Sequence, residues 1–274
     1  MKIIDLEEAG EEQIIDVFNR GFSDYLIPVS MDAYVLRDYI YVNDISLKDS
    51  YMALDEDGTP QAFTFTGIRD NTGWVGGLAV DPGHRGMGYG RAVLKAQLDR
   101  VKEIGLGEIW LECMVNNEVG LGMYKRAGFK KMRKIWFLQH DSPGPRNVKC
   151  PAFETRVVSI SELLPHYDEN HIWPKAARSL SRMSLGYAAL AVKDDDVMGY
   201  IVSFPGTRST YLWDLSGNKY GEALLADHLK VTGKKQMTIA NLHDKGLLSI
   251  LQRWGFVITF SLWVMRAKLG SGFW

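Results

Sequence analysis

The sequence predicts an α/β (α+β) protein: a mixed, mostly antiparallel sheet flanked by helices, built as two tandem copies of one fold. Three observations carry this prediction. Strand-like and helix-like hydrophobic spacings alternate along the first half of the chain. A proline-rich stretch then interrupts the pattern. Beyond that stretch, several segments of the second half match the first half in order and spacing.

The first half contains a regular succession of predicted elements. Ile14, Val17 and Phe18 lie on one face of a first helix. Residues 51–68 predict a hairpin, because two strand-like runs flank the turn sequence Asp-Glu-Asp-Gly. Asn117 is a candidate N-cap for a later short helix. The remaining elements are a strand at 74–80, a helix that buries Leu94, Leu98 and Val101, a strand at 108–115, a short helix at 117–129 and a closing strand at 130–139.

The proline-rich stretch HDSPGPRNVKCPA, at residues 140–152, holds three of the nine prolines. Proline disfavours helix at the residue before it, so the stretch predicts an extended boundary segment. We therefore expect one domain at residues 1–145 and a second at 150–274. Within the second, residues 244–256 align without gaps on residues 117–129. A repeated fold explains this match, and chance similarity between two amphipathic helices is the alternative.

The composition excludes several classes of protein. The net charge is −1, so there is no general electrostatic attraction to nucleic acid or to an anionic membrane. No run approaches the roughly 18 apolar residues of a membrane span. Cys113 and Cys150 are too few for a disulfide framework, and the N-terminal stretch MKIIDLEEAGEEQ lacks the apolar centre of a signal peptide. We expect a cytoplasmic protein with no nucleic-acid partner and no membrane partner.

The segment LAVDPGHRGMGYGRAVL, at residues 78–94, places three glycines where a strand is followed by a helix. A helix N-terminus offers unpaired N–H groups and the positive end of the helix dipole. Glycine lets the backbone approach a phosphate closely. Gly86, Gly88 and Gly90, with Arg85 beside them, therefore predict a loop that binds phosphates. A glycine-rich turn without a ligand is the alternative, and the lack of Gly-Lys-Ser/Thr excludes the nucleotide-binding P-loop.

Two motifs occur together in the first half. Residues 85–90, RGMGYG, fit the signature Arg/Gln-x-x-Gly-x-Gly/Ala. Residues 110–129, WLECMVNNEVGLGMYKRAGF, fit the pattern Leu-Glu-Val-x-x-x-Asn-x-x-Ala-x-x-Leu-Tyr-x-x-x-Gly-Phe with three substitutions, Cys113, Gly120 and Met123. In this order the motifs resemble the GCN5-related N-acetyltransferases, the GNAT family. The resemblance covers roughly residues 3–139 and implies the acyl-CoA N-acyltransferase fold, with the second half a degenerate copy as in tandem-GNAT members.

The resemblance implies how acetyl-CoA binds as a co-substrate. In the family, the strand before the loop separates from its neighbour and its backbone pairs with the pantetheine arm. Here that strand ends in Leu78, Ala79 and Val80. Asn117 would bond the pantetheine from the other side. The pyrophosphate would be bound by the loop residues Arg85, Gly86, Met87, Gly88, Tyr89 and Gly90.

The resemblance also implies catalytic roles. Tyr124 falls where the family has a tyrosine that faces the coenzyme sulfur, so it is the candidate general acid, and a tyrosine packed between helix and sheet is the alternative. Glu112 lies in an apolar strand, where a carboxylate is costly unless it is used or paired. It is the candidate base, acting through water as in some N-terminal acetyltransferases of the family, and a structural role is equally open. The N–H of Leu78 is the implied oxyanion donor.

The acceptor site is the least determined part of the prediction. In the family, the segment between the first two helices shapes this site, here residues 21–39. We expect Asp24 to hold an ammonium group and Tyr25 to line the pocket. A helix N-cap or an exposed loop position is the alternative for Asp24. No metal is expected, because the six histidines and two cysteines show no metal-ligand spacing.

The second half has lost the residues that would bind or use the coenzyme. Ile239 aligns with Glu112, and Leu251 aligns with Tyr124. Three further changes affect coenzyme binding: Asp244 for Asn117, Ser216 for Arg85 and Lys219 for Gly88. The sequence therefore predicts one coenzyme site per chain, in the first half, and a second domain that completes the substrate groove or the fold.

These residues favour an acetyl-CoA-dependent N-acetyltransferase. The expected reaction transfers the acetyl group directly to a primary amine of a small molecule in a ternary complex. Two alternatives remain open: an acyl-CoA sensor without turnover, and an acetyltransferase for protein N-termini or lysines. The oligomeric state is left open.

Overall fold

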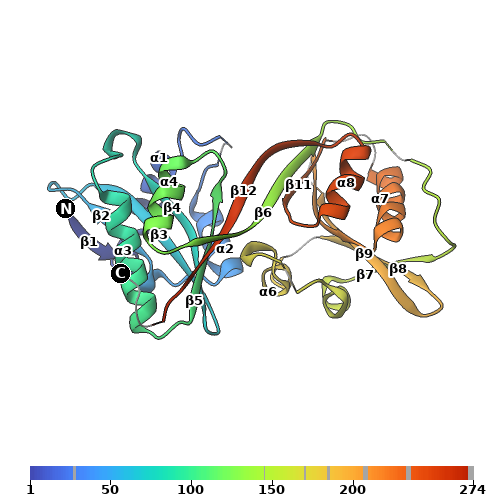
Figure 1. Ribbon diagram of the computed structural model, residues 1–274, viewed down its shortest axis with the longest axis horizontal. Coiled ribbons are helices and arrows are strands. Elements are labelled where there is room, and N and C mark those ends of the chain that lie inside the picture. The colour runs from blue at the N-terminus through green and yellow to red at the C-terminus, as the bar shows by residue number, and fades with distance from the viewer. Residues whose placement is uncertain are drawn as a thin grey trace. The chain divides into compact units, whose positions relative to one another are not determined.

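The computed structural model describes residues 1–26, 29–144, 146–169, 171–183, 186–205, 209–232 and 236–270. The chain divides into two compact units. The first unit comprises Met1–Met132 together with Val264–Trp274, and the second unit comprises Arg133–Trp263. Each unit carries strands and helices in the same succession (Figure 1).

These boundaries differ from the predicted domains at 1–145 and 150–274. The proline-rich stretch is a connection inside the second unit, because the strand before it, β6 (Lys130–His140), pairs with β11 (Gln236–Leu242). The end of the chain returns to the first unit, where the N–H of Leu269 donates to the carbonyl of Gly107 at 2.9 Å. Local sequence carries no signal for such a return, since it depends on long-range strand pairing.

The first unit is built on strands β1 to β5, in that order across the sheet, and β12 follows β5. The pairs from β1 to β4 are antiparallel, and β4 pairs with β5 in parallel. This mixed, mostly antiparallel sheet confirms the predicted fold class. The strands are β1 (Lys2–Asp5), β2 (Tyr51–Leu54), β3 (Pro60–Arg69), β4 (Thr72–Val80), β5 (Glu108–Met114) and β12 (Val257–Lys268), and the helices are α1 (Glu11–Gly21), α2 (Ala33–Asn43), α3 (Tyr89–Glu103) and α4 (Glu118–Arg126).

Helices α1 and α3 cover opposite faces of this sheet. Successive side chains of β3 point to opposite faces, and they contact the two helices in turn. Phe63 and Phe65 contact the ring of Phe18 on α1, at centroid distances of 5.6 and 6.4 Å. Thr64, between them in sequence, bonds to Gln97 on α3 at 2.9 Å. The predicted apolar face of α3, Leu94, Leu98 and Val101, is fully buried, as are Ile14 and Val17 on α1.

The second unit repeats this order of elements. Its sheet runs β12-β6-β11-β10-β9-β8-β7, and β10 pairs with β11 in parallel, as β4 does with β5. Helix α7 follows β10 and α8 follows β11, at the places that α3 and α4 take in the first unit (Figure 1). The elements after β6 are β7 (Glu154–Val158), α5 (Ile160–Leu163), α6 (Ala177–Leu180), β8 (Tyr187–Lys193), β9 (Asp196–Pro205), β10 (Ser209–Ser216), α7 (Asn218–Thr232), β11 (Gln236–Leu242) and α8 (Lys245–Arg253).

Candidate active site

Strands β4 and β5 separate in the middle of the first unit. They pair in parallel only at three positions, from Thr72 opposite Glu108 to Trp74 opposite Trp110. Two residues after Trp74, Gly76 forms a bulge, since Thr66 of β3 faces Val75 whereas Phe65 faces Gly77. A side chain at Gly76 would lie 2.7 Å from the Trp74 ring, so only glycine fits there. The bulge bends β4 away from β5, so that beyond Trp74 one edge of β4 has no strand partner among the described residues.

The backbone of β4 presents polar groups along this open edge. The N–H of Asp81 donates to the carbonyl of Gln61 at 2.8 Å, which makes these two residues a hydrogen-bonded pair of the antiparallel ladder. Such pairs alternate with non-bonded pairs. Ala79 therefore bonds to β3, whereas the N–H and C=O groups of Leu78 and Val80 point into the gap. The guanidinium of Arg85 donates to the Val80 carbonyl at 3.3 Å, which agrees with this direction. Of the three predicted residues, Leu78 and Val80 can offer backbone groups to a ligand there.

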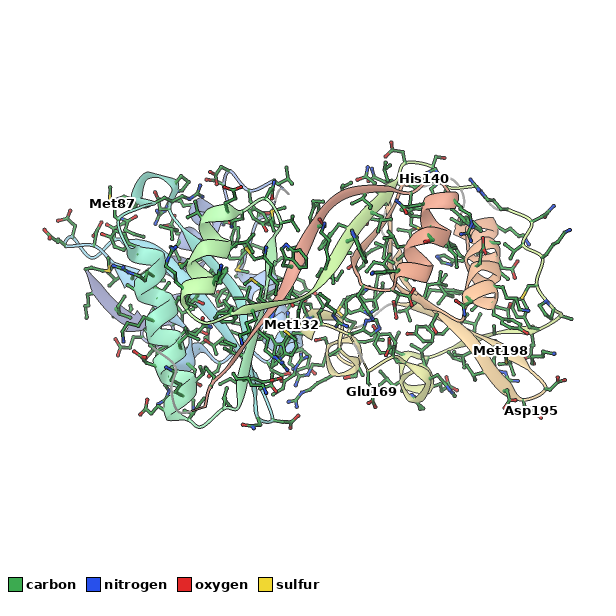
Figure 2. All side chains as sticks on the ribbon, in the orientation of Figure 1. Met87, Met132, His140, Glu169, Asp195 and Met198 are labelled. Carbon is green, nitrogen blue, oxygen red and sulfur yellow. The ribbon has the colours of Figure 1, made fainter. Side chains whose placement is uncertain are left out.

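The glycine-rich loop connects this edge to the N-terminus of α3. Gly86 and Gly88 have φ angles of +80° and +92°, which L side chains rarely adopt, and no atom lies within 4 Å of where their Cβ would stand. Among the described residues, no group accepts a hydrogen bond from the N–H of Gly86, Met87 or Gly88. The side chain of Met87 is 63% exposed at the surface of the loop (Figure 2). Open N–H groups therefore surround the start of α3, at Tyr89.

Gly90 is a glycine for a different reason. A Cβ there would lie 3.0 Å from Cγ2 of Val80, so the residue allows close packing of α3 on β4. The sequence analysis predicts one function for all three glycines, the close approach of a phosphate. The structure divides them: Gly86 and Gly88 permit the positive φ angles of an open loop, and Gly90 permits the contact between helix and strand.

Ion pairs hold the loop against the end of α1. Arg85 donates to both carboxylate oxygens of Asp24, at 2.6 and 2.7 Å. Arg20 pairs with Asp81, whose carboxylate also accepts from the N–H of Gly83 at 3.0 Å. The hydrogen bond from Arg85 lowers the pKa of Asp24. Both oxygens of Asp24 thus accept from Arg85, and its role toward the acceptor ammonium stays a prediction.

We expect Asp24→Asn to change coenzyme affinity rather than amine affinity. The substitution removes a negative charge beside the loop and frees the Arg85 guanidinium for a phosphate. The KM for acetyl-CoA should fall about two- to fivefold, because an exposed ion pair of this kind contributes at most about 1 kcal/mol. Steady-state kinetics with both substrates varied measures the effect. A raised KM for the amine with an unchanged KM for acetyl-CoA would return Asp24 to the acceptor site.

Tyr124, Tyr25 and Cys113 form a buried cluster beside the gap. Burial, with smaller contributions from the neighbouring Cys113 and Tyr25, raises the pKa of Tyr124. Burial also raises the pKa of Tyr25 to about 12 and that of Cys113 to about 12. Among the described residues, none accepts or donates a hydrogen bond at the Tyr124 hydroxyl. The phenol therefore stays protonated at neutral pH and keeps its O–H as a donor, which is the form that a general acid requires.

The C-terminus of α4 fixes the position of Tyr124. Gly128, with a φ of +84°, ends the helix, and the N–H of Phe129 bonds back to the Tyr124 carbonyl at 3.0 Å. The rings of Tyr124 and Phe129 meet edge to face at 5.7 Å. The predicted N-cap at the other end is confirmed, since Oδ1 of Asn117 accepts from the N–H of Gly120 at 2.9 Å. This bond uses the side-chain oxygen of Asn117. The exposed side-chain NH₂ group is left as the donor predicted for pantetheine.

Glu112 lies in the part of β5 that has left β4. Its Oε2 accepts a hydrogen bond of 2.8 Å from the indole N–H of Trp74, the last residue of β4 that pairs with β5. Its charge also contributes to the raised pKa of the buried Tyr39, of which burial is the larger cause. The sequence did not identify Trp74 as a partner, although the Gly76-Gly77 pair after it signals a bulge. The contact fixes the orientation of the Glu112 carboxylate.

The second unit has no comparable loop in the part of it that the structure describes. Gly217 alone separates β10 from α7, whereas residues 81–88 separate β4 from α3. A Cβ at Gly217 would lie 2.4 Å from the carbonyl oxygen of Met198, so the turn is closed by backbone. This geometry agrees with the predicted loss of coenzyme binding there.

The described residues also bear on metal sites and membrane spans. Within the ranges that the structure describes, no three histidine, cysteine, aspartate or glutamate side chains are grouped so that they could hold a metal ion. Over the same ranges, no helix has both the length and the apolar character needed to cross a membrane. Cys113 and Cys150 are free thiols.

An antiparallel sheet with one splayed parallel pair, a glycine loop at the next helix and a tyrosine after the following strand together define the acyl-CoA N-acyltransferase fold. Residues 13–129 match the Acetyltransferase (GNAT) family. The matched segment lies within the first unit.

The curated proteins that the chain resembles include named acetyltransferases. The chain is 30% identical over 78 residues to the ribosomal protein bS18-alanine N-acetyltransferase of Escherichia coli, a match that spans 28% of this chain and 53% of that enzyme. It is 40% identical over 82 residues to the mycothiol acetyltransferase of Propionibacterium freudenreichii, covering 28% of this chain and 26% of that one. The chain thus spans about half of the length of the first relative and about a quarter of the length of the second.

The tandem arrangement also occurs in a solved structure. A tandem GNAT protein from the clavulanic acid biosynthesis pathway aligns with a TM-score of 0.71 over 99% of both chains. Its sequence identity is 14%, so the likeness concerns the fold. It extends over both units, which supports the interpretation of the second half as a repeat of the first.

Proposed function

We propose that the protein is an acetyl-CoA-dependent N-acetyltransferase that acetylates a primary amine of a small molecule by direct transfer in a ternary complex. The observation that carries this proposal is the open edge of β4 at Leu78, with the Tyr124 cluster beside it and the N-terminus of α3 beyond it. The edge offers backbone partners for an extended amide chain such as pantetheine. The loop offers N–H groups for a pyrophosphate. The two free cysteines are in keeping with a reducing cytoplasm.

The residues of the first unit suit each step of the transfer. The amine nitrogen attacks the thioester carbon, and the resulting oxyanion accepts a hydrogen bond from the N–H of Leu78. The carbon–sulfur bond then breaks, and the departing thiolate takes the proton of the Tyr124 hydroxyl. As the amide forms, its nitrogen gives up a proton, which returns to the Tyr124 phenolate. No acyl-enzyme is needed, and the raised pKa of Cys113 argues against a thiolate nucleophile.

The amine must lose a proton before it attacks, because a lysine-like amine has a pKa of about 10.4. We propose Glu112 as the base, through one water. The bond from Trp74, the last residue of β4 that pairs with β5, orients its carboxylate. The structural alternative remains, since the same bond would hold Glu112 in place without catalysis.

Glu112→Gln separates the two roles, because glutamine can still accept from the Trp74 indole but cannot take a proton. If Glu112 is the base, kcat/KM should fall about 100-fold or more while the melting temperature changes little. Trp74→Phe is the matched control, because it removes the donor and keeps the carboxylate. A Trp74→Phe variant that loses as much activity as Glu112→Gln, or a fully active Glu112→Gln variant, would leave Glu112 with a structural role.

Aromatic rings support a small cationic acceptor. Phe22 contacts the ring of Tyr25 at 5.2 Å and that of Phe63 at 6.1 Å. Half-buried aromatic faces next to the Tyr124 cluster would attract an ammonium group, which they bind through cation–π interaction. Tyr25 is thus the acceptor residue that we retain from the sequence. The relative that is named an alanine N-acetyltransferase favours a second candidate acceptor, the N-terminal amine of a protein.

The proposal is tested by release of coenzyme A from acetyl-CoA with a panel of amines at mildly alkaline pH. The panel should include small amines and peptides with a free N-terminus. Turnover of small amines alone supports the proposal, and turnover of peptides alone supports the second candidate. Binding of acetyl-CoA without turnover of any amine would leave a sensor, and the enzymatic proposal would be wrong.

A further inference from the structure

Tyr39 lies at the point where the open edge of β4 begins. It belongs to α2, and its hydroxyl donates a hydrogen bond to the carbonyl of Gly76, the bulged residue. Its ring contacts those of Phe65 and Trp74, at centroid distances of 5.7 and 6.4 Å. The side-chain amide of Asn43, one turn further along α2, donates to the Tyr39 carbonyl at 3.1 Å. The function proposed above gives Tyr39 no part.

The Gly76 carbonyl is the first polar group of this edge. Gly77 faces Phe65 of β3, two positions before Ala79, so by the same alternation it bonds to β3. The peptide group is planar and trans, so the N–H of Gly77 and the carbonyl of Gly76 point in opposite directions. The carbonyl therefore points away from β3, to the side of the Leu78 N–H, which is the next polar group along the edge.

The surroundings of the Tyr39 hydroxyl agree with this direction. Burial is the larger cause of the raised pKa of Tyr39, and the charge of Glu112 on β5 adds to it. Because β5 is the strand that separates from β4 here, the effect of Glu112 places the phenol on the β5 side of Gly76. The raised pKa keeps the phenol protonated at neutral pH, so its O–H stays a donor to the carbonyl.

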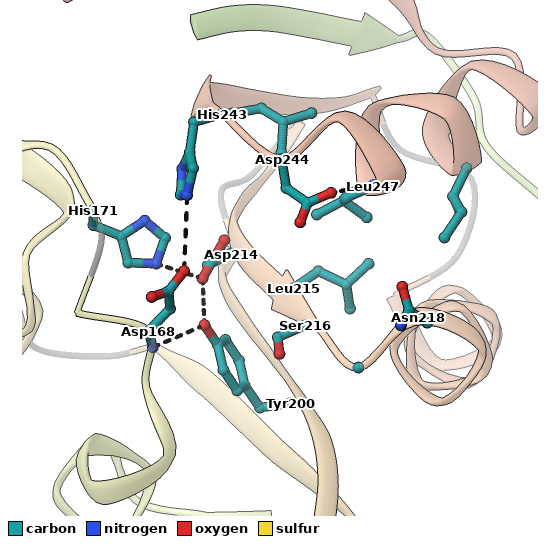
Figure 3. Close-up of a pocket in the computed structure, with 13 residues that line it drawn as sticks. Asp168, His171, Tyr200, Asp214, Leu215, Ser216, Asn218, His243, Asp244 and Leu247 are labelled. Carbon is teal, nitrogen blue, oxygen red and sulfur yellow. Dashed lines mark hydrogen bonds and ion pairs between the residues drawn. The ribbon is translucent and has the colours of Figure 1, made fainter. Parts of the chain in front are cut away.

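The second unit repeats the bulge with different residues. β10 pairs with β11 in parallel up to Tyr211, and its register against β9 shifts between Leu212 and Asp214. Trp213 thus takes the place that Gly76 has in the first unit. The Asp214 carboxylate beside it accepts from the Tyr200 hydroxyl at 2.7 Å, within a group of side chains that lines a cavity (Figure 3). A bulge by itself therefore does not define a backbone site, and the groups around it decide.

An extended ligand that pairs with a strand edge uses the carbonyl and N–H groups that the edge leaves open. With the Gly76 carbonyl bound by Tyr39, the usable edge begins at the N–H of Leu78. We propose that Tyr39 is a positioning residue that closes the edge at Gly76 and so sets the register of the coenzyme. The thioester oxygen then meets the Leu78 N–H, and the pantetheine amides lie toward Val80. This inference rests on the proposed function, because it requires acetyl-CoA in the gap.

Tyr39→Phe removes the hydroxyl and keeps the ring against Phe65 and Trp74. The freed Gly76 carbonyl then accepts from a pantetheine amide, and the coenzyme moves along the edge, away from the oxyanion contact. We expect acetyl-CoA to bind at least as tightly as before. The kcat should fall by up to about tenfold, since one added hydrogen bond favours the shifted register by about that factor.

The test follows the amide signal of Leu78 by NMR, in the full chain with isotopically labelled leucine, and requires no amine. In the unmodified protein, acetyl-CoA should shift this signal relative to coenzyme A, because only acetyl-CoA carries the thioester oxygen. Tyr39→Phe should lose this difference while it still binds acetyl-CoA in a calorimetric titration. Tyr34→Phe, the same change at a 78% exposed tyrosine of α2, is the matched control and should keep the difference.

Kinetics with the panel amine that is turned over fastest give a second measurement, in which kcat should fall without a rise in the KM for acetyl-CoA. A difference at Leu78 and a kcat that both persist in Tyr39→Phe would overturn the inference and leave the proposed function standing. Weaker binding of acetyl-CoA together with a lower melting temperature would show a packing role and overturn it too. No difference at Leu78 in the unmodified protein would overturn the register, and no binding of acetyl-CoA would overturn the proposed function as well.

Discussion

Tyr124→Phe is expected to lower kcat by about 100- to 10,000-fold, the usual cost of losing a general acid. The substitution removes one oxygen from a buried ring and keeps its packing against Phe129. Because no described residue bonds to that hydroxyl, neither the melting temperature nor the affinity for acetyl-CoA should change much. Pre-steady-state release of coenzyme A measures the chemical step directly.

Tyr25→Phe is the matched control for this prediction. It makes the same chemical change in a neighbouring tyrosine whose pKa is also raised by burial. We expect it to raise the KM for the amine and to have a small effect on kcat. Equal losses of kcat in the two variants would mean that the cluster acts through its packing. An unchanged kcat in Tyr124→Phe would show that the thiolate leaves without this acid.

Gly88→Glu is expected to weaken acetyl-CoA binding by at least about 30-fold. The left-handed φ of +92° at this position costs a side-chain residue about 1–2 kcal/mol. The carboxylate then adds repulsion toward a pyrophosphate, roughly a further 1 kcal/mol or more at contact distance. Gly88→Ala separates the two effects, because it keeps the strain and lacks the charge.

Lys219→Glu is the control in the second unit, since Lys219 aligns with Gly88 and is exposed. It should leave acetyl-CoA binding unchanged. A loss of binding in this variant as large as that in Gly88→Glu would contradict the assignment of the coenzyme site to the first unit.

Local patterns were sufficient for the elements that build the coenzyme site. The spacing of Leu94, Leu98 and Val101 predicted the buried face of α3, and the N-cap at Asn117 was read from residue type and position. Both follow from interactions within a few residues. The resemblance implied that this strand separates from its neighbour but did not place the bulge. The Gly76-Gly77 pair is the local signal for its position.

Features that depend on residues far apart in the chain were missed or misassigned. The ion pair between Asp24 and Arg85 joins positions 61 residues apart, so the sequence did not predict it and indicated the acceptor amine as the partner of Asp24. Two further features also join residues that are far apart in the chain. They are the bond from Trp74 to Glu112 and the return of the chain end to the first unit. Tertiary pairing of this kind is set by the fold and leaves no periodicity in the sequence.

The two units show how one fold can keep or lose a ligand site. In the first, an open loop and a bulged strand leave backbone groups facing a gap. In the second, one glycine closes the same connection, and side chains around Asp214 line the space.

The central claim is that one acetyl-CoA site exists per chain, in the first unit. Calorimetric titration of acetyl-CoA into the pure protein tests it most directly, beside the Gly88→Glu variant. The account predicts one site per chain, lost in the variant. Two sites would contradict the interpretation of the second unit, and no binding at all would contradict the assignment of the loop and of the proposed reaction together.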